Sequence, residues 1–315
     1  MTKVSIIIPL HNAVAFIEEA ITSCLNQSFS NIEVIVVENG SKDDSWNMVK
    51  RIQDLRLKCF QISNANAAAA RNFGFKEADG DYIMFLDADD VLAPNKIELQ
   101  LASLAHKPKD WLASCAWAKF THDIKEAKIE PQAVWTEEDS LVWCIKSFMG
   151  HGMMIPGCWL IPKTVIEKAG LWDERLSLHD DGEFMCRALL ASKAQVFVED
   201  TCVYYRQVEG SLSRNNQSLQ AAKSALAVCQ SYDKQLLQRQ DNDQVRRALA
   251  YNYCRLLYEF YPKHKSVLKE ARQHLKKLKV KSSPPIGGKL FKQLTSILGF
   301  YNALRLKSIF YNSSL

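Results

Sequence analysis

The sequence predicts an α/β fold, in which a mostly parallel sheet flanked by helices is followed by a helical extension at the C-terminal end. Three observations lead to this prediction. Apolar β-branched runs alternate with amphipathic helical runs over the first 110 residues, at spacings that suit parallel crossover connections. Polar residues stand where each of these strands ends. After about residue 216 only helical periodicity remains.

The first 110 residues contain four apolar runs short enough to be strands, at 4–10, 32–38, 58–63 and 82–86. Helical patterns separate them. The first of these helices is expected to be capped by Asn12 and to run to about Asn26. The second lies near 43–54, and the third is "NANAAAARNFGFKEA", closed by "DG".

From about residue 111 the regular alternation of strand and helix patterns is lost. "WLASCAWAKF" predicts a strand, 137–148 a short helix, and "IPKTVIEKAG" a helix closed by glycine. "DDGEFMCRALLA" predicts another helix, and "AQVFVEDTCVYYR" one or two strands. Helices are then predicted at 216–239, 242–260 and 264–280, with a last one at 289–310 after the break "SSPPIGG".

Composition and charge exclude several classes of protein. The nine cysteines are scattered without a CxxC pair, which argues against a zinc knuckle or a disulfide framework. The net charge is +5, yet residues 262–315 alone carry +11, which leaves −6 for residues 1–261. A diffuse nucleic-acid surface is therefore not expected, and the basic tail suits a local anionic surface. The chain shows neither a signal-peptide core nor an apolar run of ~20 residues, so we expect a cytoplasmic protein.

One stretch, "GDYIMFLDADD" at 80–90, runs a buried strand directly into Asp87, Asp89 and Asp90. Such a turn either caps the next helix or holds a cation. Asp90 is expected to cap the helix that Pro94 enters. Two carboxylates two residues apart suit a hard divalent cation, whose remaining ligands can come from an anionic group such as a phosphate.

Five stretches together resemble a known family. "VSIIIPLHN", "IEVIVVENGSKDDS", "AAAARNFG", "YIMFLDADD" and "HDDGEF" are similar, in order and spacing, to the signature of family-2 glycosyltransferases with the GT-A fold. The resemblance covers roughly residues 3–215. It implies a nucleotide-sugar-binding half at 1–110 and an acceptor-binding half with the catalytic base at 111–215. The basic helical extension predicted at 216–315 lies outside the resemblance.

For the donor, the resemblance implies that Asp89 is the ligand of a Mn²⁺ or Mg²⁺ ion. Asp87 either lies against the ribose of the nucleotide or reaches the metal through water. Arg71 is expected to contact the nucleotide, since its planar fork suits a phosphate or a base edge.

The first two loops differ from the family pattern. Pro9 and His11 match the loop where the family usually packs an aromatic ring on uracil, and histidine stands there instead. Glu38 and Asn39 stand where two aspartates are common, one of which usually accepts the N3–H of uracil. Either residue can accept this hydrogen bond, so UDP is the expected nucleotide. The amide of Asn39 differs from an aspartate in that it can also donate.

For the acceptor, the resemblance implies that Asp181 is the base that deprotonates the attacking hydroxyl, with Asp180 beside it. Arg206 and Ser211 lie in a stretch that resembles a loop closing over the donor phosphates. Trp159, two residues after Gly157, is a candidate sugar platform.

The expected activity is inverting transfer of a hexosyl or N-acetylhexosaminyl group from a UDP-sugar to a glycan or lipid-linked acceptor, in bacterial surface polysaccharide or lipopolysaccharide synthesis. The alternatives are a haloacid-dehalogenase-type phosphatase that uses the same aspartates, and a non-catalytic sugar-nucleotide-binding protein. The apolar stripe at 289–310, flanked by lysines, predicts either an interfacial helix on the anionic inner face of the plasma membrane or a helix packed on protein.

Overall fold

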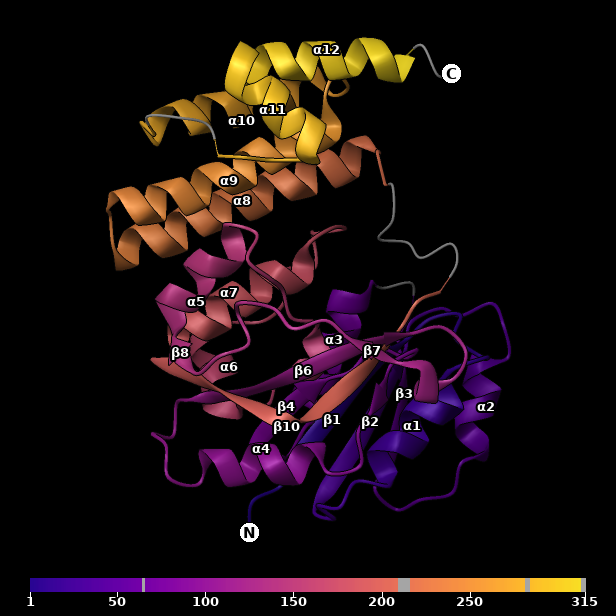
Figure 1. Ribbon diagram of the computed structural model, residues 1–315. Coiled ribbons are helices and arrows are strands. Elements are labelled where there is room, and N and C mark those ends of the chain that lie inside the picture. The colour runs from indigo at the N-terminus through magenta and orange to yellow at the C-terminus, as the bar shows by residue number, and fades with distance from the viewer. Residues whose placement is uncertain (64–65, 209–215, 281–283, 313–315) are drawn as a thin grey trace. The chain divides into compact units, whose positions relative to one another are not determined.

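The computed structural model describes residues 1–63, 66–208, 216–280 and 284–312 (Figure 1). It divides into two compact units. The first comprises Met1–Trp143, Gly152–Glu174 and Asp180–Ser211, and the second comprises Cys144–His151, Arg175–His179 and Leu212–Leu315. Segments 1–110 and 111–215 of the sequence thus both contribute most of their residues to the first unit.

The first unit is built on a sheet with the strand order β3-β2-β1-β4-β9. Four of its strands run parallel and β9 runs antiparallel. The bounds are β1 Val4–Leu10, β2 Ile32–Glu38, β3 Leu57–Gln61, β4 Tyr82–Phe85 and β9 Ile161–Pro162. Every residue of β1 and β2 is buried, as expected for central parallel strands covered on both faces. The predicted parallel α/β core is confirmed.

The helices of the first unit follow the predicted order with shifted ends. They are α1 Ile17–Leu25, α2 Ser45–Arg51, α3 Ala67–Lys76, α4 Lys96–Leu104, α6 Lys163–Ala169 and α7 Asp180–Ala191, with short 3₁₀ turns at Ile124–Glu126 and Pro156–Cys158. The prediction that Asn12 caps the first helix is wrong. Asn12 has φ +50°, and its side chain accepts a hydrogen bond from the N–H of Lys42 at 2.8 Å. The helix begins only at Ile17.

A second sheet in the same unit has the order β5-β10-β6-β7, with β8 also paired to β10. Its strands are β5 Val91–Leu92, β6 Leu112–Phe120, β7 Lys128–Ile129, β8 Glu138–Asp139 and β10 Ala194–Arg206. The stretch predicted as one or two strands is the single strand β10, and its register against β6 shifts between Val198 and Cys202. This irregularity lets one strand bend and continue.

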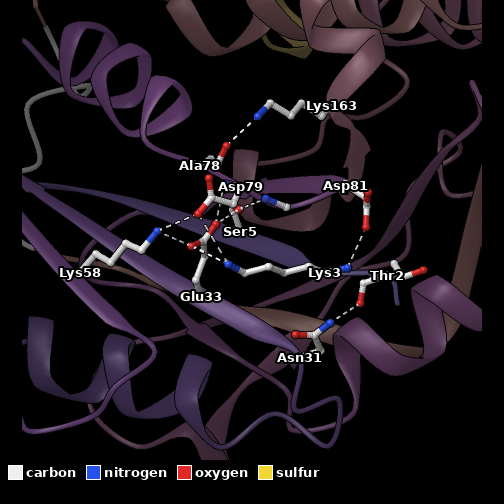
Figure 2. Close-up of polar contacts among 11 residues, drawn as sticks. Thr2, Lys3, Ser5, Asn31, Glu33, Lys58, Ala78, Asp79, Asp81 and Lys163 are labelled. Atoms are coloured by element: carbon white, nitrogen blue, oxygen red, sulfur yellow. Dashed lines mark hydrogen bonds and ion pairs between the residues drawn. The ribbon is translucent and has the colours of Figure 1, made fainter.

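The amino-terminal edge of the first sheet is held by a buried carboxylate, shown in Figure 2. The Glu33 side chain is 3% exposed and forms ion pairs with Lys3 at 2.9 Å and Lys58 at 2.8 Å. It also accepts hydrogen bonds from Ser5 Oγ at 2.5 Å and from the N–H of Asp79 at 2.7 Å. Burial alone would raise the pKa of Glu33, but these contacts outweigh it and lower the pKa to about 2.

The second unit is helical. Its helices are α8 Leu219–Arg239, α9 Asp243–Phe260, α10 Lys265–Lys277, α11 Lys289–Leu298 and α12 Phe300–Asn312, and α5 Ser140–Phe148 spans the boundary of the two units. The single helix predicted at 289–310 is wrong, because Gly299 has φ +77° and separates α11 from α12. Throughout the described residues, no helix combines the length and the apolar character that crossing a bilayer requires.

Candidate donor and base site

The candidate site lies at the carboxyl-terminal edge of the first sheet. In register, Leu10 at the end of β1 stands opposite Glu38 at the end of β2, and Ile7 stands opposite Phe85 at the end of β4. The loops that follow these three strands therefore emerge at one edge, which is where parallel α/β sheets bind ligands. The Glu33 cluster lies at the opposite edge and stabilises the sheet there.

The first two loops are tied together by Asn12. Its N–H donates to Ser41 Oγ at 3.0 Å, and its carbonyl oxygen accepts from Lys42, so the turn after β1 is fastened to the turn after β2. His11 is exposed, with Nε2 3.0 Å from the amide of Asn12. Pro9 lies buried within β1. Of these two predicted contacts, His11 is therefore the one that is accessible to a base.

Glu38 and Asn39 are both buried in the second loop. The carboxylate of Glu38 accepts hydrogen bonds from the N–H of Ser41 and from Gln61 Nε2 at 2.9 Å. Burial would raise its pKa, yet these donors outweigh burial and lower it. The N–H of Asn39 donates to the carbonyl of Leu10 at 3.0 Å. Glu38 thus shapes the loop, which leaves Asn39 as the better candidate for reading the base.

The acidic turn after β4 holds three carboxylates in different surroundings. Asp87 is one-third exposed, whereas Asp90 is fully buried and accepts the N–H of Arg206 at 3.1 Å. The predicted helix cap at Asp90 is wrong, since α4 begins at Lys96 after Asn95. Burial, with the neighbouring charge of Asp87, raises the pKa of Asp89 to about 6. Burial and both neighbours raise the pKa of Asp90 well above its usual range.

This crowding of carboxylates fits a hard cation. A divalent ion at Asp89 would relieve the repulsion that raises the pKa values, and oxygen ligands are those that Mg²⁺ and Mn²⁺ prefer. In the part of the chain that the structure describes, no group of three or more His, Cys, Asp or Glu side chains is arranged to hold a metal. Sites completed by substrate phosphates need only one or two carboxylates. Asp89 and Asp87 therefore fit such an ion.

Arg206, the last residue of β10, supports the acidic turn after β4. Its side chain is 6% exposed, its Nε donates to the carbonyl of Asp89 at 2.9 Å, and its guanidinium pairs with Glu19. The same group lies over the rings of Phe16 and Phe120, at 5.0 and 4.3 Å. The predicted direct phosphate contact at Arg206 does not fit this burial. Arg206 instead supports the backbone that carries Asp89.

Arg71 joins the acidic turn to the acidic pair that opens α7. Its Nη2 donates to Asp87 at 2.7 Å and its Nη1 donates to Asp180 at 3.2 Å, and the side chain is 7% exposed. Burial would lower its pKa, but the two carboxylates outweigh burial and raise it. Asp87 and Asp180 lie 93 positions apart in the sequence, and this one guanidinium bonds both. The sequence predicted each residue separately and did not predict their contact.

Asp181 is the second member of the acidic pair. Its Oδ1 accepts the N–H of Gly182 at 2.7 Å, and burial raises the pKa of its carboxyl, with Gly182 and Arg71 offsetting part of the effect. Burial likewise raises the pKa of Asp180, against the charge of Arg71. Glu183, on the same helix, forms an ion pair with Arg187 at 2.7 Å. A carboxylate with a raised pKa beside an arginine is suited to accept a proton.

Two predicted contacts are not placed at this site. Trp159 is 1% exposed and lies edge-on against Trp143 at 5.2 Å, so its ring is part of the core and offers no face to a sugar. Ser211 lies outside the described residues. Two residues that the sequence analysis missed do lie here, Asn72 and Trp172. The runs "ARN" and "GLWDE" contained them, but nothing in either pattern indicated that Trp172 contacts Arg71 or that Asn72 bonds the backbone of Trp172.

Comparisons with known proteins agree with this architecture. The sequence model described as Glycosyl transferase family 2 matches residues 5–168. An uncharacterized glycosyltransferase of Haemophilus influenzae is 47% identical over 104 residues, which is 32% of this chain and 42% of that protein. An uncharacterized glycosyltransferase of Rickettsia typhi is 32% identical over 193 residues, 60% of this chain and 59% of the relative. The chain thus spans about half the length of these curated relatives.

A solved structure shows a similar fold. S. aureus TarS residues 1–349, in complex with UDP-GlcNAc, superposes with a TM-score of 0.72 at 17% identity. The match covers 99% of this chain and 92% of the TarS chain. At this identity the likeness establishes the GT-A-type fold alone.

Proposed function

Since the chain belongs to glycosyl transferase family 2, we propose that it transfers a sugar from a UDP-sugar to a hydroxyl of a glycan or lipid-linked acceptor. One observation carries this proposal: the buried Arg71 bonds both a donor-side carboxylate, Asp87, and a base-side carboxylate, Asp180. The TarS structures with UDP-GlcNAc and UDP support UDP as the nucleotide. The sugar itself is proposed to be a hexose or an N-acetylhexosamine.

On the donor side, we assign Asp89 as the ligand of a Mn²⁺ or Mg²⁺ ion and Asp87 as a contact of the nucleotide. Such an ion, when bound, neutralises charge on the departing diphosphate. The protein's own part is to hold Asp89 in place, through the contact of Arg206 with its backbone. We propose that His11 packs against the uracil ring and that Asn39 hydrogen-bonds its polar edge.

On the acceptor side, we assign Asp181 as the general base. It takes the proton of the attacking hydroxyl, which attacks the anomeric carbon from the face opposite the diphosphate, so the product has inverted configuration. Its raised pKa favours proton uptake near neutral pH compared with an ordinary aspartate. Asp180, bonded to Arg71, orients the start of α7 and leaves Asp181 as the carboxylate that carries the proton.

The structure divides the predicted stripe of the tail into two sets of residues. Phe291, Phe300 and Leu304 are buried within the second unit, whereas Leu290 and Ile297 on α11 are 71% and 78% exposed. The surrounding segment 262–315 carries +11. We propose that this face binds the anionic inner surface of a bacterial plasma membrane, where a lipid-linked acceptor for surface polysaccharide or lipopolysaccharide is presented.

The phosphatase alternative fits the structure less well. That chemistry needs its nucleophilic aspartate after the first strand of the fold, and here Asp87 follows β4 and is paired with Arg71.

The non-catalytic alternative, a protein that binds a sugar nucleotide without transferring the sugar, is decided by experiment. A panel of nucleotide-sugars is screened for thermal stabilisation with and without Mn²⁺, and the hits are tested for release of free nucleotide. Stabilisation by UDP-sugars with nucleotide release supports the proposal, and stabilisation without release over many hours supports a binding protein.

A further inference from the structure

Arg71 is held from a third side by an aromatic ring. Its guanidinium carbon lies 4.4 Å from the centre of the indole of Trp172, a residue that is 3% exposed. The Nε of Arg71 is buried and meets no acceptor among the described residues. The direction of the guanidinium is therefore set by its two carboxylate partners and by the plane of this ring.

Trp172 is itself fixed by the elements that carry the site. Asn72, next to Arg71 on α3, accepts the N–H of Trp172 and donates to its carbonyl, both at 2.9 Å. The indole is stacked on Phe184 of α7, with centroids 4.3 Å apart and planes 9° apart. It meets Phe85 at the end of β4 edge-on at 5.2 Å. The ring thus contacts α3, β4 and α7, which supply Arg71, the acidic turn and the acidic pair.

We propose that Trp172 is a positioning residue for the transfer reaction and that it acts through Arg71. An arginine side chain has many rotamers, and several of them would allow it to pair with two carboxylates on opposite sides. Contact with a fixed indole restricts the guanidinium to the orientation in which Nη1 faces Asp180 while Nη2 faces Asp87. Trp172 thereby sets the distance between the donor carboxylates and the base. This inference rests on the proposed function of the site.

The test compares Trp172→Leu, Trp172→Phe, Arg71→Ala and the double variant Trp172→Leu/Arg71→Ala, by release of UDP from the panel of UDP-sugars with Mn²⁺, with rates taken on the best donor. We expect Trp172→Leu to lower kcat about tenfold with KM within twofold, because the ring lies against Arg71, Phe85 and Phe184 and acts on the reacting groups through Arg71. Trp172→Phe, which keeps a ring, should retain at least a third of kcat. The double variant should be no slower than Arg71→Ala alone.

Trp111→Leu is the matched control, since it removes a partly buried indole that lies 4.8 Å from Lys107, outside the site. Its kcat should equal that of the wild type. Losses that multiply in the double variant, or an equal loss in Trp172→Phe and Trp172→Leu, would show that Trp172 only fills space. If the wild type releases no UDP, the proposed function fails. The positioning claim is then decided by a crystal structure of Trp172→Leu, in which Arg71 should leave Asp87 or Asp180, and an unmoved Arg71 overturns it.

Discussion

Replacing Glu33 by glutamine should destabilise the protein by an amount that depends on pH. The pKa of Glu33 is about 2 in the folded protein, against 4.5 for the free side chain. The difference corresponds to about 3 kcal/mol of unfolding free energy near neutral pH. Its side chain is only 3% exposed, so screening by solvent reduces this figure little. Lys3 and Lys58 keep Asp79 as an acidic partner, at 3.9 and 3.1 Å, and both are about one-third exposed and can be hydrated.

The sign follows from the direction of the shift. The pKa of Glu33 is lower in the folded than in the unfolded chain, so its stabilisation is complete above about pH 4.5 and is lost as the pH falls towards 2. Urea unfolding of the wild type and of Glu33→Gln should differ by about 3 kcal/mol at pH 7 and by about 1 kcal/mol at pH 3. Glu77→Gln, on an exposed residue, serves as the control and should unfold like the wild type at pH 7.

A difference between the wild type and Glu33→Gln that stays constant from pH 7 to pH 3 would refute this reasoning. It would mean that the glutamine disturbs packing at the edge of the sheet and that the ion pairs with Lys3 and Lys58 contribute little.

Three further predictions concern the site and the tail. Asp89→Ala should abolish Mn²⁺-dependent binding of UDP in calorimetry while thermal unfolding stays near that of the wild type, and metal-dependent binding that survives would remove Asp89 as the ligand. Transfer from an α-linked UDP-sugar should give a β-linked product by NMR, and an α-linked product would contradict inversion. Leu290→Glu/Ile297→Glu should lower binding to anionic vesicles at least tenfold in co-sedimentation, because each exposed apolar side chain contributes roughly 25 cal/mol per Å² buried. Salt should weaken binding of the wild type, and Leu55→Glu, at a leucine that is more exposed but lies outside the tail, should change nothing.

The sequence was sufficient to predict the parallel core and the acidic turn. A buried parallel strand can be recognised in the sequence as a continuous apolar run, because both of its faces must be apolar. The runs at 4–10 and 32–38 are fully buried in the structure. The residues that follow such strands must meet at one edge of the sheet, so the positions of Asp87 and Asp89 could be foreseen. What each carboxylate does inside the turn could not be foreseen.

The errors share a physical cause, since a local pattern does not show a long-range partner. Asp90 has the sequence context of a helix cap, and its partner is the N–H of Arg206, 116 residues away. Asn12 has the same cap-like context, and it bonds the turn after β2 instead. The contact of Trp172 with the site could not be predicted from its own sequence context, because it depends on Arg71, which lies over the ring and is 101 positions earlier in the chain.

The most direct test of the account is the rate at which Asp181→Asn releases UDP from the best UDP-sugar donor, measured beside Asp180→Asn and the wild type. We predict that Asp181→Asn lowers the rate by roughly 10²–10⁴-fold, as expected for loss of a general base, while its affinity for UDP and Mn²⁺ stays near that of the wild type. An Asp181→Asn protein that keeps the wild-type rate, with Asp180→Asn inactive, would contradict the assignment of the base.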